Sequence, residues 1–226
     1  MHIITWVFIV LGLVAAGFFG LIFLVIMLSS KPTRGRKIDD YTNSKKALLV
    51  VDIQEDFTGI AARSPFPFKG SDTLISTVNR LLDAASGNDL LVAYIGHELP
   101  DNFISRALTG SRSIKGQPGA RMDSRLHIVN SNYFSKCISD SFSSWKLNDF
   151  LENNHVNEVY IVGLDGEKCV YKTALGALNR GYKVTIIKDA IVYMSQKDLS
   201  EVTKMYENDG ISVIFSSELL NCTAIT

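Results

Sequence analysis

The sequence predicts an α/β domain with a mainly parallel sheet and helices on both faces, arranged in three layers. After residue 45, short apolar runs alternate with stretches whose apolar residues recur at helical spacing, as in chains of strand–helix–strand units. The apolar runs are nearly continuous, which is typical of strands buried on both faces. With 226 residues, the chain has the length for one sizeable domain of this class.

The first half of the domain contains two expected strands and one expected helix. The strands cover residues 47–53 and 89–96, since each is a short and almost wholly apolar run. Residues 74–86 carry apolar side chains three and four positions apart, so we expect an amphipathic helix there. Residues 97–125 are rich in Gly, Ser and Arg and are expected to form a long loop.

Strands and helices continue to alternate in the second half. The expected strands cover residues 126–130, 158–164, 183–189 and 211–215, and the expected helices cover residues 143–154, 169–181 and 198–210. Ser143 or Ser144 can cap the first of these helices, and Gly181 ends the second.

Residues 1–30 are predicted to form a transmembrane helix. From Ile3 to Ser30 the chain has no charged residue, and this run exceeds the ~20 residues that a helix needs to cross a bilayer. A cleaved signal peptide is the alternative. It is disfavoured because the segment lacks a charged n-region and its apolar run is about twice as long as a usual h-region.

The flanks of this segment predict its orientation. Only the amino terminus and His2 precede the span, whereas four basic residues follow it: Lys31, Arg34, Arg36 and Lys37. The positive-inside rule then places the C-terminal part of this single-pass membrane protein in the cytoplasm.

The rest of the chain is expected to comprise a polar, partly basic linker at residues 31–44 and a single domain at residues 45–226. Because 23 basic residues balance 23 acidic ones and no basic stripe is visible, no nucleic acid is expected as a partner. Three cysteines do not make a disulfide framework and are typical of a reducing compartment.

Several polar residues lie where predicted strands end. Sites in parallel sheets form at the carboxyl ends of strands, and this rule selects Asp52, His97 and residues 163–169. Cys169 begins a predicted helix, where the helix N-terminus favours a thiolate and free N–H groups can hold an oxyanion. Taken singly, each residue also has an ordinary interpretation: a loop-capping aspartate, a packed cysteine and, for Lys136, a solvated lysine.

Four stretches together are characteristic of a known family. LLVVDIQEDF is similar to a strand followed by D-x-Q-x-D-F, and GQPGARMDSRL to a glycine-containing loop before the third strand. KCISDSF keeps a lysine six residues before a phenylalanine, and VGLDGEKCVYKTALGALNRGY resembles the signature G-x-x-x-x-x-C-V followed by T-A-x-x-A and G-Y. Over residues 45–215 the chain thus resembles the isochorismatase-like cysteine hydrolases, which include nicotinamidases and related amidases.

The resemblance implies a catalytic triad of Asp52, Lys136 and Cys169. Asp52 would act as general base toward the thiol and then as acid toward the leaving group, while Lys136 would lower the pKa of the thiol. Cys169 would attack a carbonyl carbon and form an acyl-enzyme. The resemblance also implies a cis peptide bond between Leu164 and Asp165, which aims the amides of Asp165 and Cys169 at one oxyanion.

Other positions depart from the family pattern. Metal-dependent nicotinamidases carry D-x-H-x-x-H after the second strand, whereas this chain reads YIGHELPDNF with His97 alone, so no metal or other cofactor is expected. His97 is then either a substrate contact or a structural loop residue. Phe57, Phe142 and Trp145 are candidate walls for a small substrate, with burial in the core as the alternative.

Two functions from different classes follow. The first is a membrane-anchored cysteine hydrolase that cleaves an amide-type C–N bond of a small molecule in the cytoplasm. The second is a catalytically idle domain that serves as a membrane-tethered ligand-binding or assembly module, since a small diffusible substrate needs no tether. The resemblance further implies a homo-oligomer, whose size the sequence does not determine.

Overall fold

The computed structural model describes residues 31–85, 90–195 and 198–223, together with isolated positions between residues 6 and 27. The chain divides into two compact units, Met1–Lys31 and Pro32–Thr226. The predicted transmembrane segment, residues 1–30, lies mostly outside the described residues. Within the part that is described, no helix is both long enough and apolar enough to cross a membrane.

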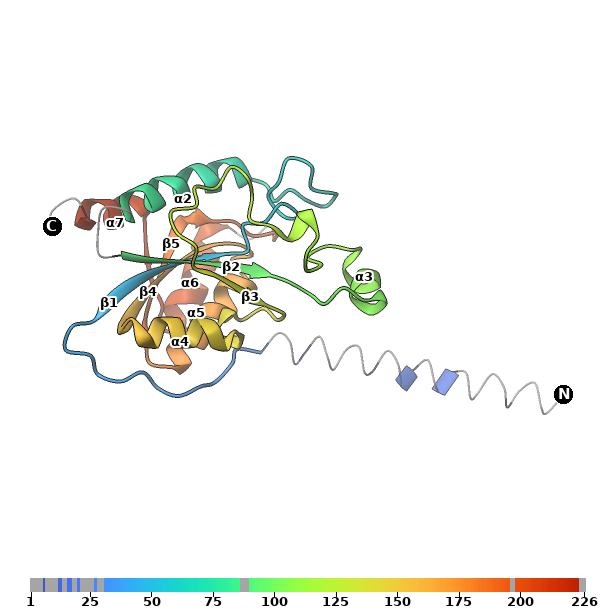
Figure 1. The fold of residues 1–226 in the computed structure, drawn as a ribbon, viewed down its shortest axis with the longest axis horizontal. Coiled ribbons are helices and arrows are strands. Elements are labelled where there is room, and N and C mark those ends of the chain that lie inside the picture. Colours follow the sequence, from blue (N-terminus) through green and yellow to red (C-terminus); the bar gives the residue numbers. More distant parts are fainter. Residues whose placement is uncertain are drawn as a thin grey trace. The chain divides into compact units, whose positions relative to one another are not determined.

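The second unit is built on a six-stranded parallel sheet with the strand order β3-β2-β1-β4-β5-β6 (Figure 1). The strands are β1 (Lys45–Val51), β2 (Leu90–His97), β3 (Tyr133–Lys136), β4 (Val156–Gly163), β5 (Lys183–Ile191) and β6 (Ser212–Ile214). The chain begins in the middle of the sheet, builds one half through β2 and β3, and then crosses to β4 beside β1. The strand order therefore reverses between β1 and β4, and the predicted parallel α/β fold is confirmed.

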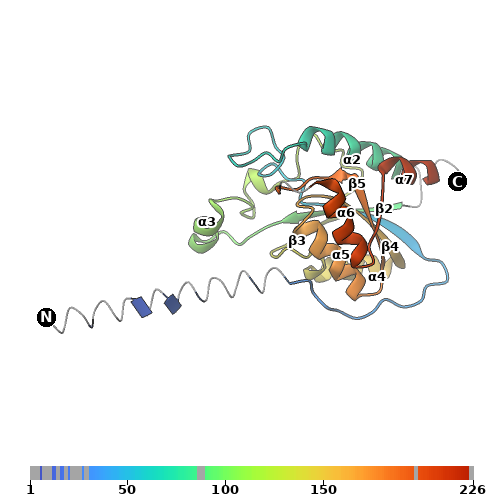
Figure 2. The ribbon, with the colours of Figure 1, turned by 180° about the vertical axis from the view of Figure 1, so that it is seen from behind.

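Helices cover both faces of this sheet (Figures 1 and 2). One face carries α2 (Ser71–Ala85) and α7 (Ser216–Thr223), and the other carries α4 (Trp145–Asn153), α5 (Cys169–Asn179) and α6 (Leu199–Asn208). The two layers of helices and the sheet between them make the predicted three-layer arrangement. Helix α7 was not expected from the sequence.

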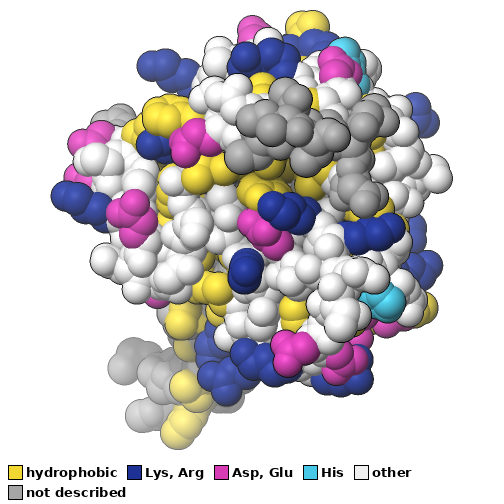
Figure 3. Space-filling view, turned by 90° about the vertical axis from the view of Figure 1, so that its left-hand side faces the viewer, with side chains coloured by type: hydrophobic (Ala, Val, Ile, Leu, Met, Phe, Trp, Pro, Cys, Tyr) yellow, Lys and Arg dark blue, Asp and Glu magenta, His cyan; other side chains and the backbone are white. Residues whose placement is uncertain are grey.

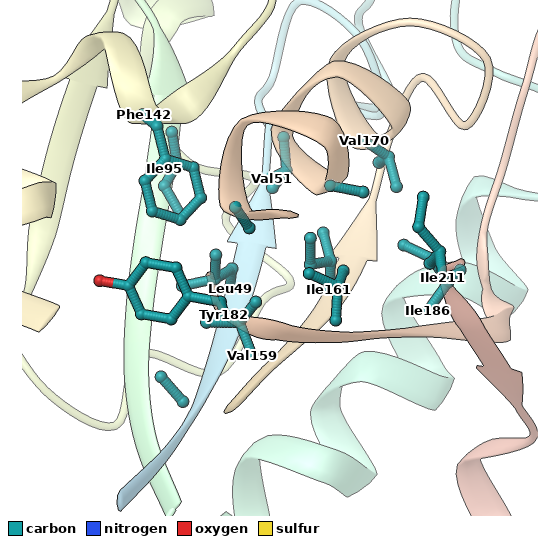
Figure 4. Packing of buried hydrophobic residues seen from close by; sticks show 14 of the residues in the cluster. Leu49, Val51, Ile95, Phe142, Val159, Ile161, Val170, Tyr182, Ile186 and Ile211 are labelled. Carbon is teal, nitrogen blue, oxygen red and sulfur yellow. The ribbon is translucent and has the colours of Figure 1, made fainter. Parts of the chain in front are cut away.

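The central strand β1 is buried on both sides. Ala47, Leu49 and Val51 contribute to the core beneath α4, α5 and α6, part of which is drawn in Figure 4, while Leu48 and Val50 contribute to the core beneath α2. Successive side chains of a strand point to opposite faces, so the continuous apolar run in the sequence fills two cores. All five residues have no exposed surface.

The strand predicted over residues 126–130 is wrong. The edge strand is β3, Tyr133–Lys136, and residues 126–130 form an irregular stretch beside it. The hydroxyl of Tyr94 donates to the carbonyl of His127 and accepts from the N–H of Val129, both at 3.0 Å. Because a side chain satisfies this backbone, the stretch can be apolar without pairing in the sheet.

The predicted loop over residues 97–125 contains one helix and one turn of 3-10 helix. They are α3 (Phe103–Thr109) and Pro118–Ala120. Helix α3 begins at a clear cap, because Oδ1 of Asn102 accepts from the N–H of Ser105 at 2.9 Å.

Residues 31–44 were expected to be a linker, but part of this segment is held by the domain. The N–H and the hydroxyl of Thr33 both donate to Oδ2 of Asp140 at 2.6 Å. Arg180 donates to the Thr33 hydroxyl at 3.0 Å and accepts from the N–H of Ile38 at 2.9 Å. Asp140 is fully buried, and a buried carboxylate needs donors, which is the physical reason for this docking.

We expect Thr33→Val to lower the free energy of unfolding by about 1–3 kcal/mol, because it removes one donor from a buried acceptor. Thr42→Val is the matched control at an exposed position of the same segment, with an expected change within about 0.5 kcal/mol. Urea unfolding followed by circular dichroism measures both. Equal effects of the two substitutions would contradict a role for the Thr33 hydroxyl.

Candidate active site

The candidate active site lies at the carboxyl ends of the strands, where the strand order reverses between β1 and β4. Asp52 directly follows β1, Lys136 is the last residue of β3, and Cys169 is the first residue of α5. Because parallel strands end at the same edge of a sheet, the crevice at such a reversal is where ligands bind. The fold therefore gathers the three residues predicted to form the triad.

Lys136 and Asp52 form a buried ion pair. Nζ of Lys136 donates to Oδ2 of Asp52 at 2.8 Å, and the two side chains are 0% and 3% exposed. Burial disfavours the ammonium form, but the negative charge of Asp52 and the hydrogen bonding of Lys136 to Asp52 and Cys169 outweigh it, so the pKa of Lys136 is raised. Lys136 is therefore a fixed cation at the centre of the site.

The thiol of Cys169 is neutral in the free protein. Burial, followed by the negative charge of Asp52, raises its pKa from 9.0 to about 12, and Lys136 acts in the opposite direction. Lys136 thus lowers this pKa, as expected, but burial and the charge of Asp52 outweigh it, so the net shift is upward. Lys136 is paired with Asp52, which weakens its effect on the thiol. The desolvation of the thiol therefore dominates the pKa of Cys169.

The carboxylate of Asp52 retains a free acceptor. Its Oδ2 is engaged by Lys136, whereas its Oδ1 is buried and has no hydrogen-bond partner among the described residues. An unsatisfied buried acceptor is costly, and Cys169 is close enough for Asp52 to influence its titration. The arrangement can thus move a proton from the thiol to Asp52.

The turn after β4 packs directly against β1. Gly163 has a φ of 118°, and a Cβ atom at this position would lie 2.0 Å from the carbonyl oxygen of Val51, so the site requires glycine. The N–H of Leu164 donates to that same carbonyl at 3.0 Å. The peptide bond between Leu164 and Asp165 is cis.

Two amides of this turn are available for an oxyanion. The carbonyl of Asp165 accepts from the N–H groups of Lys168 and Val170 at 3.0 and 3.1 Å. By contrast, the N–H groups of Asp165 and Cys169 donate to no other group within the described chain. That of Cys169 belongs to the first turn of α5, where N–H groups have no intrahelical acceptor.

A cavity of about 170 Å³ opens at the thiol. Its apolar walls are Phe57, Phe66, Phe68, Leu164 and Met194, and its polar lining comprises Asp52, Ser139, Asp165, Lys168 and Cys169. The ring of Phe66 lies 5.3 Å from each of the rings of Phe57 and Phe68, measured between centroids. The site therefore offers a small pocket with aromatic walls and charges at one end.

Of the predicted wall residues, only Phe57 lines this cavity. Phe142 is 2% exposed and packs against Tyr182 in the core, with ring centroids 5.4 Å apart. Trp145 is 67% exposed at the start of α4, beside a separate surface depression. Sequence reasoning missed Phe66 and Phe68, although the repeated Pro-Phe of SPFPFKG was a signal for a structured aromatic loop.

His97 lies beside the ion pair and not in the cavity lining. It pairs with Lys136 in the parallel ladder of β2 and β3. Burial, and then the charge of Lys136, lower its pKa to about 4, so the imidazole is neutral near pH 7. Its Nδ1 is buried and has no hydrogen-bond partner in the described residues.

The residues around His97 do not fit a metal ion. The neighbouring carboxylate of Glu98 accepts a hydrogen bond from the Tyr133 hydroxyl at 2.9 Å. Across the described ranges, no group of three or more His, Cys, Asp or Glu side chains is arranged to hold a metal ion. A single imidazole is a poor metal site, so no step of the reaction is assigned to a metal here.

We expect Lys136→Met to lower the free energy of unfolding by about 3–5 kcal/mol, because it leaves the Asp52 carboxylate buried without its partner. Adding Asp52→Asn should recover part of the loss, since the second change removes the unpaired charge. Lys146→Met, at an exposed lysine of α4, is the control. Urea unfolding compares the variants, and a loss no larger than that of the control would show that the pair is not desolvated.

Comparison with known proteins gives a consistent assignment. A family model described as Isochorismatase domain matches residues 46–217. The nicotinamidase of Escherichia coli (strain K12) is 28% identical over 178 residues, covering 64% of this chain and 81% of that protein. The pyrazinamidase of Pyrococcus horikoshii, solved in complex with zinc, superposes with a TM-score of 0.65 at 27% identity, covering 76% of this chain and 99% of that chain.

A third comparison concerns the fold alone. An isochorismatase-like hydrolase from Alkaliphilus metalliredigens superposes with a TM-score of 0.70 at 21% identity, covering 79% of this chain and 98% of that chain. The fold of the second unit is therefore shared with a solved hydrolase. Since the family model spans well over half of its residues, this chain belongs to the isochorismatase family of hydrolases.

Proposed function

We propose that this protein is a membrane-anchored cysteine hydrolase that cleaves the C–N bond of a small amide in the cytoplasm through an Asp52–Lys136–Cys169 triad. The observation that carries the proposal is the buried ion pair between Lys136 and Asp52, with the Cys169 thiol beside it at an apolar cavity. An ion pair in this position costs desolvation energy and is expected where the charges do chemistry.

The reaction begins with a proton transfer. As Sγ of Cys169 attacks the amide carbon, its proton moves to Oδ1 of Asp52, and Lys136 stabilises the negative charge that builds on sulfur. The C=O bond becomes a C–O⁻ bond, and the free N–H groups of Asp165 and Cys169 donate to this oxyanion. A raised thiol pKa suits this sequence, because the nucleophile is activated only as the base accepts its proton.

The second half returns the proton. Collapse of the tetrahedral intermediate breaks the C–N bond, and protonated Asp52 gives its proton to the departing nitrogen. The acyl group remains on Cys169 as a thioester. Asp52, again a carboxylate, takes a proton from water as the water oxygen attacks the thioester carbon. The C–S bond then breaks, the carboxylic acid leaves, and Asp52 returns its proton to Sγ of Cys169.

The cavity and the relatives support a small amide as the substrate. A volume of about 170 Å³ and three phenylalanine walls suit a compact, largely apolar acyl group. Three similar proteins are named as a nicotinamidase, a pyrazinamidase and an N-carbamoylsarcosine amidase, all of which imply C–N cleavage. The Pyrococcus pyrazinamidase was solved in complex with zinc. By contrast, the substrate proposed for this chain does not need a ring nitrogen that binds a metal.

The proposal includes a single-pass membrane anchor at residues 1–30, followed by the segment 31–44 and the hydrolase domain at 45–226. Its support is the uncharged run from Ile3 to Ser30 and the basic residues that follow it. Cytoplasmic placement agrees with the free thiols of Cys137 and Cys169.

We expect Cys169→Ala to reduce amide hydrolysis by at least about a thousandfold, because it removes the nucleophile. Cys137→Ala is the matched control, since that thiol is exposed and does not line the cavity. Ammonia release from a panel of small primary carboxamides measures both. Unchanged hydrolysis by Cys169→Ala would contradict the mechanism, and no release by the unmodified chain from any amide would favour the idle binding module.

We expect alkylation of Cys169 by iodoacetamide to accelerate about tenfold per pH unit up to about pH 10, because only the thiolate reacts. A pKa of about 12 keeps the thiolate a small fraction throughout this range. Mass spectrometry follows Cys169 and the exposed Cys137 in the same sample, so the reagent is controlled internally. A Cys169 rate that reaches a plateau near neutral pH would contradict the raised pKa.

A further inference from the structure

Helix α3 has the reverse of the usual amphipathic arrangement. Its apolar residues Phe103, Ile104 and Leu108 are 85%, 67% and 59% exposed, and no residue of the helix is buried. The polar side chains between them are the less exposed ones. An ordinary surface helix turns its apolar stripe toward the core, so α3 presents an apolar face that the domain does not cover.

A neighbouring loop exposes a further apolar residue and is hydrogen-bonded to the end of α3. Ile60 is 84% exposed, and its loop is tied to α3, because Arg63 donates to the carbonyl of Gly110 at 2.9 Å. In return, Arg112 donates to the carbonyl of Ser64 at 2.6 Å. We call Ile60, Phe103, Ile104 and Leu108 the α3 surface. Figures 1 and 2 show α3 standing away from the sheet, at the end of the domain opposite α7.

The segments that form the α3 surface are strongly basic. Residues 58–70 and 99–117 contain five basic side chains, Arg63, Lys69, Arg106, Arg112 and Lys115, and a single acidic one, Asp101. Asp101 is already engaged, since its Oδ1 lies 2.6 Å from Nε of Arg106. On the face of the domain shown in Figure 3, by contrast, basic and acidic side chains are interspersed.

We propose that the α3 surface lies against the anionic face of a lipid bilayer. Exposed apolar side chains on a helix, in segments rich in Lys and Arg, suit insertion at the headgroup boundary, where anionic lipids attract the basic groups. A second copy of this chain fits less well, because two surfaces with the same excess of positive charge repel each other. The proposal rests on the membrane anchor of the proposed function, which holds the domain near a bilayer.

The α3 surface is also connected to the catalytic cavity. The guanidinium of Arg112 lies over the ring of Phe66, 5.1 Å from its centroid, and Phe66 and Phe68 line the cavity. The loop that carries Ile60 therefore runs from the proposed lipid contact to the substrate wall.

Lipid quenching of a fluorophore tests this contact. The full chain, with Cys137, Cys169 and Cys222 replaced by Ser, carries a single label at Ile104→Cys or, as the matched control, at Ser217→Cys on exposed α7. Each labelled chain is reconstituted into phosphatidylcholine vesicles, prepared with and without phosphatidylserine. Each lipid mixture is prepared with and without spin-labelled lipid. We expect at least about threefold stronger quenching at position 104 than at position 217, increasing with phosphatidylserine. Lys69→Glu with Lys115→Glu should remove the increase.

Each other outcome has a distinct meaning. If the chain does not float with the vesicles, the anchor fails; if it floats but position 104 is quenched no more than position 217, only the α3 contact fails. A label shielded equally in lipid-free detergent, and more so at higher protein concentration, would overturn the proposal in favour of a second copy. Hydrogen exchange on the unmodified chain, slowed over residues 99–117 by anionic vesicles but not neutral ones, checks the result without substitutions.

Discussion

The buried ion pair between Lys136 and Asp52 is the interaction on which the rest of the site depends. It joins the end of edge strand β3 to the end of central strand β1, two strands apart in the sheet. Two charges without water are stable only when they remain in contact, so the pair restricts how these strand ends can move. The same desolvation keeps the Cys169 thiol protonated and leaves one oxygen of Asp52 free to accept its proton.

The residues that follow Asp52 keep this arrangement in place. The buried amide of Gln54 accepts from the N–H of His97 at 2.8 Å and donates to the carbonyls of His97 and Ala120 at 3.1 and 2.6 Å. Two positions on, the carboxylate of Asp56 accepts from the N–H of Ser113 at 2.8 Å. The motif D-x-Q-x-D therefore supplies the carboxylate of the proposed triad and two side chains that hold the long segment after β2 against the centre of the sheet.

The segment beside the proposed anchor also contacts the end of the domain that carries the candidate active site. Thr33 satisfies the buried carboxylate of Asp140, which lies four residues after Lys136 and directly after Ser139 on the cavity wall. The N-terminal segment is thus hydrogen-bonded to the end of the domain that carries the candidate active site, and the compact unit begins at Pro32. Its polar composition is typical of a linker because it contacts the domain largely through hydrogen bonds; Ile38 packs against the core.

The sequence by itself determined the parallel α/β fold through its strand and helix periodicity, which is a local property. Its resemblance to the isochorismatase-like hydrolases selected Asp52, Lys136 and Cys169, which the parallel sheet brings to one edge. Tertiary structure decided the rest. The apolar residues of the stretch 126–130 do not pair in the sheet, and the hydroxyl of Tyr94 instead bonds the backbone of His127 and Val129. Phe142 is buried in the core, whereas Phe66 lines the cavity. Long-range packing determines which of the two rings reaches the cavity. The pKa of Cys169 likewise depends on how much water the assembled site excludes, and no local pattern encodes that.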